Sequence, residues 1–210
     1  MELNENLAEI VGIMLGDGCL YKEKKRNRYQ TIICFHKEEK DYQKYVKTLF
    51  ESYFNHKFYV TEIKCENLLR NTSFIVGDKL TKVGLSSGNK VSNKAAIPFW
   101  ITKDENFLRR TVRGLFDTDG CIYKKYGHYA QIVFKFGGFE MTDSLRTSLK
   151  SLGFNPTQVK KGFNREKRTD FYKFYLSRQS EIERFFIEIM PKNPKHLERY
   201  QKIKSGAAGI

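Results

Sequence analysis

The spacing of apolar residues predicts a helix near the start of the chain and a second one about a hundred residues later. Each shows the three- and four-residue recurrence of a single apolar helix face. The residues of these two faces are Leu7, Ile10, Val11 and Met14 in the first helix, and Phe107, Leu108, Val112, Leu115 and Phe116 in the second. Both stretches end in Asp-Gly, at 17–18 and 119–120, and glycine is typical of a helix C terminus.

The same succession of elements follows each helix. The first is followed by a hairpin over 19–36, a helix over 38–54, a hairpin over 57–76 and a short helix over 78–85. The second helix begins at a capping box formed by Thr102 and Glu105. It is followed by a hairpin over 121–136, a helix over 140–152, a hairpin over 154–177 and a helix over 180–190. One more helical turn is expected in 196–203. The pattern therefore predicts an α+β chain made of two αββαββα repeats.

A polar segment separates the two repeats. Residues 86–97 are rich in Ser, Asn and Lys, which is the composition of a linker. We therefore expect a first repeat over 1–85, a linker over 86–101 and a second repeat over 102–210.

The charge of the chain points to a polyanionic partner. The 210 residues contain 38 Lys and Arg against 24 Asp and Glu, which gives a formal net charge of +14. A surface of this charge favours nucleic acid as the binding partner, and an anionic membrane in second place. The alternative is that the positive charge only keeps the protein soluble. No stretch approaches the roughly 18 apolar residues of a membrane span, and the N terminus lacks a signal-peptide pattern, so we expect a soluble, intracellular protein. The cysteines and histidines do not have the spacing of a zinc site.

An aspartate at the C-terminal end of a helix is electrostatically unfavourable. The helix dipole places about half a negative charge there, and Asp17 and Asp119 each add another. A hard divalent cation bound by carboxylate and carbonyl oxygens would offset this cost. A single Asp-Gly pair is more often a plain turn, but two copies at the same point of a repeat favour a cation site.

Small residues at intervals of four occur in both helices. Gly12 and Gly16 form one pair, and Gly114 and Thr118 form the other. Such pairs leave a shallow groove in which two helices can approach backbone to backbone. Packing of this kind would bring Asp17 and Asp119 close together, whereas glycines that merely weaken a core helix would leave the repetition unexplained.

The two ten-residue stretches 12–21 and 114–123 agree at Gly, Asp, Gly, Cys and Tyr, and they resemble the paired signature of the LAGLIDADG homing endonucleases. The two copies read IVGIMLGDG over 10–18 and VRGLFDTDG over 112–120. The order of elements extends the resemblance over nearly the whole chain, in the single-chain, two-repeat form. The first copy departs at Leu15, where the signature has Asp, and Arg113 replaces a small residue and is expected to point away from the helix pair.

The resemblance implies a DNA-cutting saddle. Each repeat would contribute a four-stranded antiparallel sheet to the major groove, with the motif helices at the interface between repeats. The implied enzyme is a monomer that hydrolyses both strands of a long, imperfectly palindromic double-stranded DNA site. Its cofactor would be Mg²⁺ or another divalent cation, held by Asp17 and Asp119 with the carbonyls of Gly16 and Thr118. Family members also place a lysine near each site, for which Lys37 and Lys135 are the candidates, as catalytic groups or as plain phosphate anchors.

Basic residues cluster in the predicted hairpins. Two-stranded ribbons fit the major groove, where charged tips bind phosphate and long polar side chains read base edges. The expected DNA-binding residues are Lys22, Lys24, Arg26, Arg28, Lys64, Arg70, Lys124, Lys125, Lys160, Lys161, Arg165 and Arg168. A solvated basic loop is the alternative for each of them.

Three functions compete for this sequence. The first is a site-specific DNA endonuclease of intron homing. The second is a binding protein on the same scaffold, either a maturase that acts on host intron RNA or a repressor that has lost cleavage. The third, a structural RNA-binding protein, would show stacking motifs on exposed strands, and none is evident. Because a scaffold that only binds needs no aspartate at both helix ends, Asp17 and Asp119 favour cleavage.

Overall fold

The computed structural model describes residues 2–206, apart from the side chain of Lys24, and contains two halves of the same construction. The first half comprises α1 (Glu5–Leu15), β1 (Gly18–Glu23), β2 (Arg28–His36), α2 (Lys40–Phe54), β3 (Tyr59–Ile63), β4 (Glu66–Thr72) and α3 (Phe74–Lys82). The second comprises α4 (Glu105–Asp119), β5 (Gly120–Tyr126), β6 (Tyr129–Phe136), α5 (Phe139–Ser151), β7 (Lys160–Asn164), β8 (Thr169–Leu176), α6 (Gln179–Glu188) and α7 (Pro194–Lys204). The predicted αββαββα order is confirmed in both halves.

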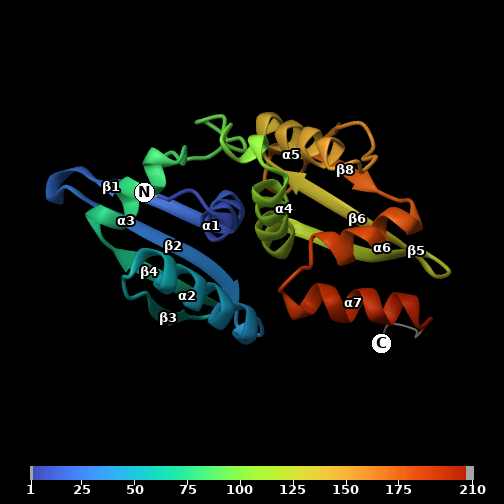
Figure 1. Ribbon diagram of the computed structural model, residues 1–210, viewed down its shortest axis with the longest axis horizontal. Helices are drawn as coiled ribbons and strands as arrows, with labels where there is room; N and C mark the ends of the chain where they lie inside the picture. The colour runs from blue at the N-terminus through green and yellow to red at the C-terminus, as the bar shows by residue number, and fades with distance from the viewer. Residues whose placement is uncertain (1, 207–210) are drawn as a thin grey trace.

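Each half is built on one four-stranded antiparallel sheet. The strand orders are β1-β2-β4-β3 and β5-β6-β8-β7, so the two sheets have equivalent topology. Helices cover one face of each sheet and leave the other face open (Figure 1). Alternation along β2 places Ile33 and Phe35 in the core and Ile32 and Cys34 on the open face. The α+β architecture with paired sheets therefore agrees with the sequence prediction.

The motif helices α1 and α4 lie side by side between the sheets (Figure 1). Glycine makes their close approach possible, because a Cβ on Gly12 would lie 2.3 Å from the carbonyl oxygen of Thr111. A Cβ on Gly114 would similarly lie 2.6 Å from the carbonyl oxygen of Glu9. The Thr111 hydroxyl donates across the interface to the carbonyl oxygen of Ala8, at 2.9 Å. Small residues thus bring the two backbones into contact, as their spacing predicts.

The expectation that Arg113 points away from the helix pair is wrong. Its side chain is 2% exposed, and its Nη1 lies 3.2 Å from Oε2 of Glu9 on α1. Its Nε donates to the carbonyl oxygen of Ile189, at 2.7 Å. Tyr45 of α2 donates its hydroxyl to the other carboxylate oxygen of Glu9, at 2.5 Å. The arginine therefore neutralises a buried carboxylate and joins the two halves.

Three helix boundaries differ from the sequence prediction. Helix α3 begins at Phe74, where a strand was expected, because the Ser73 hydroxyl caps it by accepting the N–H of Val76. Asp104 caps α4 by accepting the N–H groups of Asn106 and Phe107, so Thr102 and Glu105 do not form the expected capping box. The tail forms the complete helix α7, which starts at a proline that suits the first turn.

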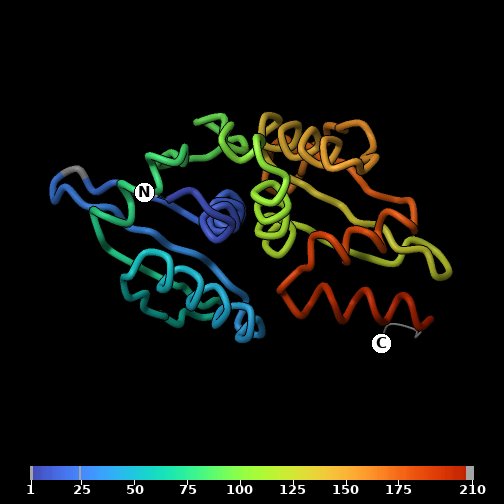
Figure 2. The backbone as a smooth tube through the Cα atoms, viewed as in Figure 1, coloured from blue at the N-terminus to red at the C-terminus, as the bar shows by residue number. Residues whose placement is uncertain are grey.

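The segment between the halves runs from the end of α3 to the start of α4 and passes along one edge of the helix pair (Figure 2). Gly88 donates its N–H to the carbonyl oxygen of Leu20, at 2.9 Å, so the segment is anchored to the first sheet. In the described part of the chain, no helix is long and apolar enough to cross a membrane.

Candidate functional site

The two motif aspartates meet at the C-terminal ends of α1 and α4. Gly16 is the C-cap of α1, with Asp17 directly after it, and Asp119 is the last residue of α4. A Cβ placed on Gly16 would lie 3.2 Å from Oδ2 of Asp119, so the second carboxylate reaches the end of the first helix. The structure therefore brings Asp17, Asp119 and Gly16 together. Thr118 lies in the same interface, where its hydroxyl donates to the carbonyl oxygen of Gly114, at 2.8 Å.

The carboxylates sit in a poorly solvated and electrostatically strained position. Burial raises the pKa of Asp119 to about 7, and repulsion from the Asp17 charge contributes to the rise. Loss of surrounding water also raises the pKa of Asp17, although the charges of Lys195 and Lys90 oppose this. Two acids that resist ionisation when close together gain from a cation placed between them.

Lys90 of the connecting segment supplies one positive charge at this place. Its ammonium donates to the main-chain oxygens of Leu15 and Gly16, the former at 2.9 Å. Burial lowers the pKa of Lys90, and the charges of Asp119 and Asp17 oppose the decrease. The last carbonyls of α1, which lack partners within the helix, are thereby satisfied.

Lys195 supplies a second positive charge from the first turn of α7. Its Nζ lies 2.7 Å from Oε1 of Glu39, which directly precedes α2 in the other half. Among the charges around Asp17, that of Lys195 lowers its pKa most. A segment of the second half thus reaches the aspartate of the first.

The two lysines hold equivalent places in the two halves. Lys90 follows the end of α3 and Lys195 follows the end of α6, the third helix of its own half. The segment after α6 also folds onto its own motif helix, since the N–H groups of Lys192 and Asn193 donate to the Asp117 carboxylate, at 2.8 and 3.1 Å. Burial raises the pKa of Asp117 to about 7, and these hydrogen bonds oppose the rise. Sequence reasoning missed both lysines, because neither lies near a motif in the chain.

Of the two lysines predicted from the strands, Lys135 lies at the site. It lines a cavity of about 200 Å³ together with Gly16, Lys90 and Asp119. It extends from the open face of β6, where its Nζ lies 4.1 Å from the centroid of the Phe171 ring. Lys37 follows the end of β2, and its side chain is exposed.

The predicted DNA-binding residues lie on the strands and turns of both sheets. All whose side chains are described are exposed, except Arg28, which is half-buried: these are Lys22, Arg26, Lys64, Arg70, Lys124, Lys125, Lys160, Lys161, Arg165 and Arg168. The side chain of Lys24 lies outside the described part of the chain. Arg28 and Lys161 pair with acids, Glu23 at 2.6 Å and Asp170 at 2.7 Å.

A row of lysines crosses the open face of the second sheet. Lys135 on β6 pairs in register with Lys173 on β8, which pairs with Lys160 on β7. The sequence analysis missed Lys173, although alternation with the buried Phe174 places it on the open face. Its ammonium lies 5.6 Å from the ring centroid of Phe171 and 5.5 Å from that of Tyr175. The row is a concentrated positive surface that begins at the cavity beside Asp119.

Comparisons with known proteins agree with this architecture. Residues 106–190 match a family model described as a LAGLIDADG-like domain. A search of curated proteins returned no significant match.

Solved structures match over nearly the full chain. A mesophilic variant of the homing endonuclease I-DmoI has 18% identity and a TM-score of 0.64, with 89% of this chain and 95% of that chain covered. I-DmoI in complex with DNA and Mn has 17% identity and a TM-score of 0.63, over 90% of this chain and 97% of that chain. The N-terminal LAGLIDADG domain of DUF199/WhiA has 16% identity and a TM-score of 0.56, over 91% of this chain and 85% of that chain. The second half of the chain therefore matches a LAGLIDADG-like domain, and the whole chain has the fold of the single-chain, two-repeat LAGLIDADG proteins.

Proposed function

We propose that this chain is a site-specific DNA endonuclease of intron homing, which cuts both strands of a long, imperfectly palindromic site as a monomer. One observation carries the proposal: Asp17 and Asp119 stand together at the ends of two abutting helices, where burial raises the pKa of both carboxyls. Such an arrangement costs free energy in a protein that only binds DNA. In a nuclease the two carboxylates would bind the cation that acts on the two phosphodiesters, and the cation would offset this cost.

The donor atoms at this place fit a divalent cation. Carboxylate and main-chain oxygens are the ligands that Mg²⁺ prefers, and the candidates are Asp17, Asp119 and the carbonyls of Gly16 and Thr118. The Gly16 oxygen also accepts a hydrogen bond from Lys90, so a cation would have to share it or displace the ammonium. The described residues contain no group of three or more His, Cys, Asp or Glu side chains able to hold a metal ion. Two acids alone leave ligand positions for water and for DNA phosphate, as a nuclease requires. A bound cation would activate the attacking water and neutralise charge on the leaving oxygen.

Lys90, Lys135 and Lys195 are the candidate lysines for steadying the scissile phosphates. Lys90 and Lys135 line the same cavity as Asp119, and Lys195 is the strongest positive influence on Asp17. An ammonium beside the reacting phosphate offsets the negative charge that increases in the transition state. Lys37 remains a candidate phosphate anchor at the end of β2.

The open faces of the two sheets form the proposed DNA interface. The row Lys135–Lys173–Lys160 lies on the open face of the second sheet, and Arg70 pairs in register with Ile32 on the open face of the first. Arg26, Lys64, Arg165 and Arg168 lie in the turns. Lys22, Lys124 and Lys161 alternate to the helix-covered faces and are less suited to contact the DNA. The match to I-DmoI in complex with DNA supports the same use of the scaffold here. The fold is also shared by the WhiA domain, so fold alone does not decide between cleavage and binding. The retained pair Asp17 and Asp119 favours cleavage over a repressor or an intron RNA maturase.

Selection of random double-stranded DNA for cleavage in Mg²⁺ tests the proposal and reports the target sequence. On that target, Asp17→Asn and Asp119→Asn are each expected to abolish double-strand cleavage. Both variants should still bind the DNA in Ca²⁺, measured by fluorescence anisotropy. Undiminished cleavage by either variant would remove that aspartate from the mechanism, and binding without any cleavage by the natural chain would favour the repressor.

Substitution of the lysines tests their proposed role. Lys90→Met is expected to slow cleavage by about 100-fold, which is typical of the loss of one transition-state charge partner. Lys94→Met is the matched control, because Lys94 lines the same cavity from the same segment. Among the described residues its ammonium forms no ion pair and no hydrogen bond to a motif helix. Equal rates for the two variants would show that Lys90 only caps α1.

A further inference from the structure

The two lysines beside the carboxylates are held by different kinds of partner. Lys195 pairs with a charged carboxylate, since its Nζ lies 2.7 Å from Oε1 of Glu39. Lys90 lies near the charges of Asp119 and Asp17, but within the described part of the chain its ammonium donates hydrogen bonds to neutral main-chain oxygens alone, those of Leu15 and Gly16. An ion pair holds an ammonium more firmly than a carbonyl does, because both partners carry full charge.

Glu39 is itself firmly fixed at the boundary between the halves. Its Oε1 also accepts a hydrogen bond from Nδ2 of Asn193, at 2.8 Å, and its Oε2 accepts the N–H of His36, at 2.9 Å. Burial by itself would raise the pKa of Glu39, but the hydrogen bonds from Lys195 and Asn193 lower it below the usual value. The carboxylate is therefore ionised at neutral pH.

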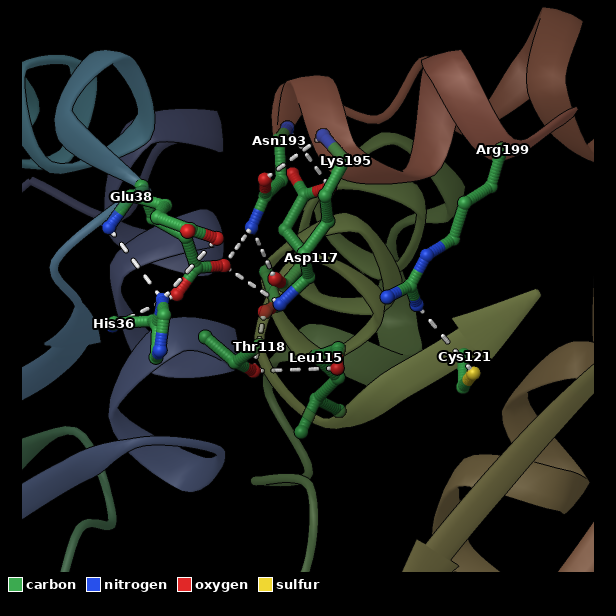
Figure 3. Close-up of polar contacts among 11 residues, drawn as sticks. His36, Glu38, Leu115, Asp117, Thr118, Cys121, Asn193, Lys195 and Arg199 are labelled. Carbon is green, nitrogen blue, oxygen red and sulfur yellow. Dashed lines mark hydrogen bonds and ion pairs between the residues drawn. The ribbon is translucent and has the colours of Figure 1, made fainter. Parts of the chain in front are cut away.

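The ion pair lies in an open hollow. A cavity of about 520 Å³ separates the corner of β2 and α2 from the start of α7, and Glu39, Asn193 and Lys195 line it. Figure 3 shows Asn193 and Lys195 directed from the second half toward the loop that carries His36 and Glu38. The lysine can therefore leave Glu39 without unpacking the core.

The other site lacks this restraint. Glu140 lies in the first turn of α5 and lines the cavity of Lys90 and Asp119. It is the counterpart in the second half of the acids around the start of α2, including Glu39, which directly precedes that helix. Among the described residues it forms no ion pair with Lys90. The two sites thus have the same groups but differ in whether the lysine is already paired.

We propose that Glu39 is a positioning residue that restrains Lys195, so that the two strands are cut in a fixed order, with the strand at the Lys90 site first. The inference rests on the proposed endonuclease function. A phosphate at the Asp17 site must displace the Glu39 carboxylate from Lys195. A phosphate at the Asp119 site meets the Lys90 ammonium, whose hydrogen bonds to the described residues go to carbonyl oxygens. The restrained site therefore acts more slowly, and a DNA nicked in one strand accumulates.

Strand-resolved cleavage tests the proposal. The selected target is labelled with a different fluorophore on each strand, and both products are followed in Mg²⁺. Lys195→Met should slow one strand selectively and so identify it as the second strand. Glu39→Gln should speed cleavage of that same strand about fivefold, as expected for loss of a partly exposed ion pair, and leave the other strand unchanged.

Glu38→Gln is the matched control. Glu38 neighbours Glu39 but is exposed, and its ion-pair contact within the described residues is with Nδ1 of His36, at 3.7 Å. Its substitution should therefore leave the order of cutting unchanged. If Glu39→Gln does not fold, Glu39→Asp replaces it, since the shorter side chain withdraws the carboxylate while keeping its charge. An unchanged order, an equal change on both strands, or slower cleavage of the second strand by the Glu39 variant would each overturn the inference.

A measurement without DNA separates this inference from the proposed function. Acetylation of the free protein, read by peptide mass spectrometry, should modify Lys195 faster in Glu39→Gln than in the natural chain, with Lys90 unaffected. Equal reactivity of Lys195 in both would show that no restraint exists. A chain that cuts neither strand overturns the proposed function, whereas cutting with an order that Glu39 does not influence overturns this inference alone.

Discussion

Glu9 of α1 and Arg113 of α4 form a buried ion pair across the interface of the two halves, with both side chains 2% exposed and Oε2 and Nη1 3.2 Å apart. Removal of Arg113 leaves the Glu9 carboxylate buried beside the more distant Arg110, at 3.6 Å. Breaking a buried ion pair by removing one partner costs about 3–5 kcal/mol. Arg113→Met is therefore expected to lower the free energy of unfolding by about 3 kcal/mol, measured by urea denaturation.

Arg109→Met provides the control for this prediction. Arg109 lies on the same helix and pairs with Glu105 at 2.9 Å, but its side chain is 28% exposed. Solvent-exposed pairs contribute at most about 1 kcal/mol, so a small loss is expected. Similar losses for both variants would contradict the assignment of Glu9 and Arg113 as the electrostatic link between the halves.

The burial of Arg113 illustrates what the sequence leaves undecided. The spacing of apolar residues places a helix over this region correctly, and Gly12 and Gly114 correctly predict its close partner. The pattern assigns charged residues to solvent, however, and it cannot reveal a carboxylate on another helix that needs a counter-ion. Arg113 becomes an interior residue because Glu9 faces it across the interface and the carbonyl oxygen of Ile189 accepts a second hydrogen bond from it.

The candidate site was predictable to a similar extent. Asp17 and Asp119 stand out because they end two equivalent helices. Lys90 and Lys195 lie more than seventy residues further along the chain, in polar segments without a recognisable pattern. They reach the helix ends only when each half folds back on itself, so the tertiary fold is required to find them.

The fit between α1 and α4 should not tolerate a side chain at Gly12. A Cβ there would lie 2.3 Å from the carbonyl oxygen of Thr111, a backbone atom that can move only with its helix. We expect Gly12→Ala to lower the free energy of unfolding by more than about 2 kcal/mol, as overpacking in a close-packed interior does. Thermal denaturation would measure the loss.

Gly138→Ala is the corresponding control for the glycine substitution. Gly138 precedes α5, has an ordinary negative φ, and a Cβ there would meet no atom within 4 Å. Its substitution should change stability by less than about 0.5 kcal/mol. An interface that accepts alanine at Gly12 as easily as at Gly138 would mean that the helices are further apart than described.

The raised acid pKa values predict an unusual dependence of stability on pH. Asp119 has a pKa of about 7 in the folded chain and about 3.8 when unfolded, so the folded state holds the extra proton between these values. Stability without metal should therefore fall as pH rises from about 4 to about 7. Asp117, with a pKa of about 7, contributes in the same direction.

Calorimetric melting temperatures at pH 5 and pH 8 check this dependence. Asp119→Asn removes one titrating group, so the difference between the two temperatures should shrink but persist because of Asp117. Addition of Ca²⁺ should raise the melting temperature at pH 8 more than at pH 5, since only the ionised carboxylates bind the cation. A Ca²⁺ effect that is equal at both pH values, or retained in full by Asp119→Asn, would argue against Asp119 as a ligand.

The lysine row on the second sheet makes a prediction about salt. Lys173 lies between Lys135 and Lys160, so a DNA backbone on the open face would pass within its reach. Each phosphate neutralised by the protein adds about 0.9 to the slope of log affinity against log salt concentration. Lys173→Gln should therefore weaken binding in Ca²⁺ and reduce this slope by about 1, as measured by anisotropy from low to moderate salt. Lys150→Gln removes an equal charge from α5, which covers the opposite face of the same sheet, and should leave the slope unchanged. If the two variants gave the same slope, the net charge of the protein would explain the binding. That result would contradict the assignment of the open face as the DNA interface.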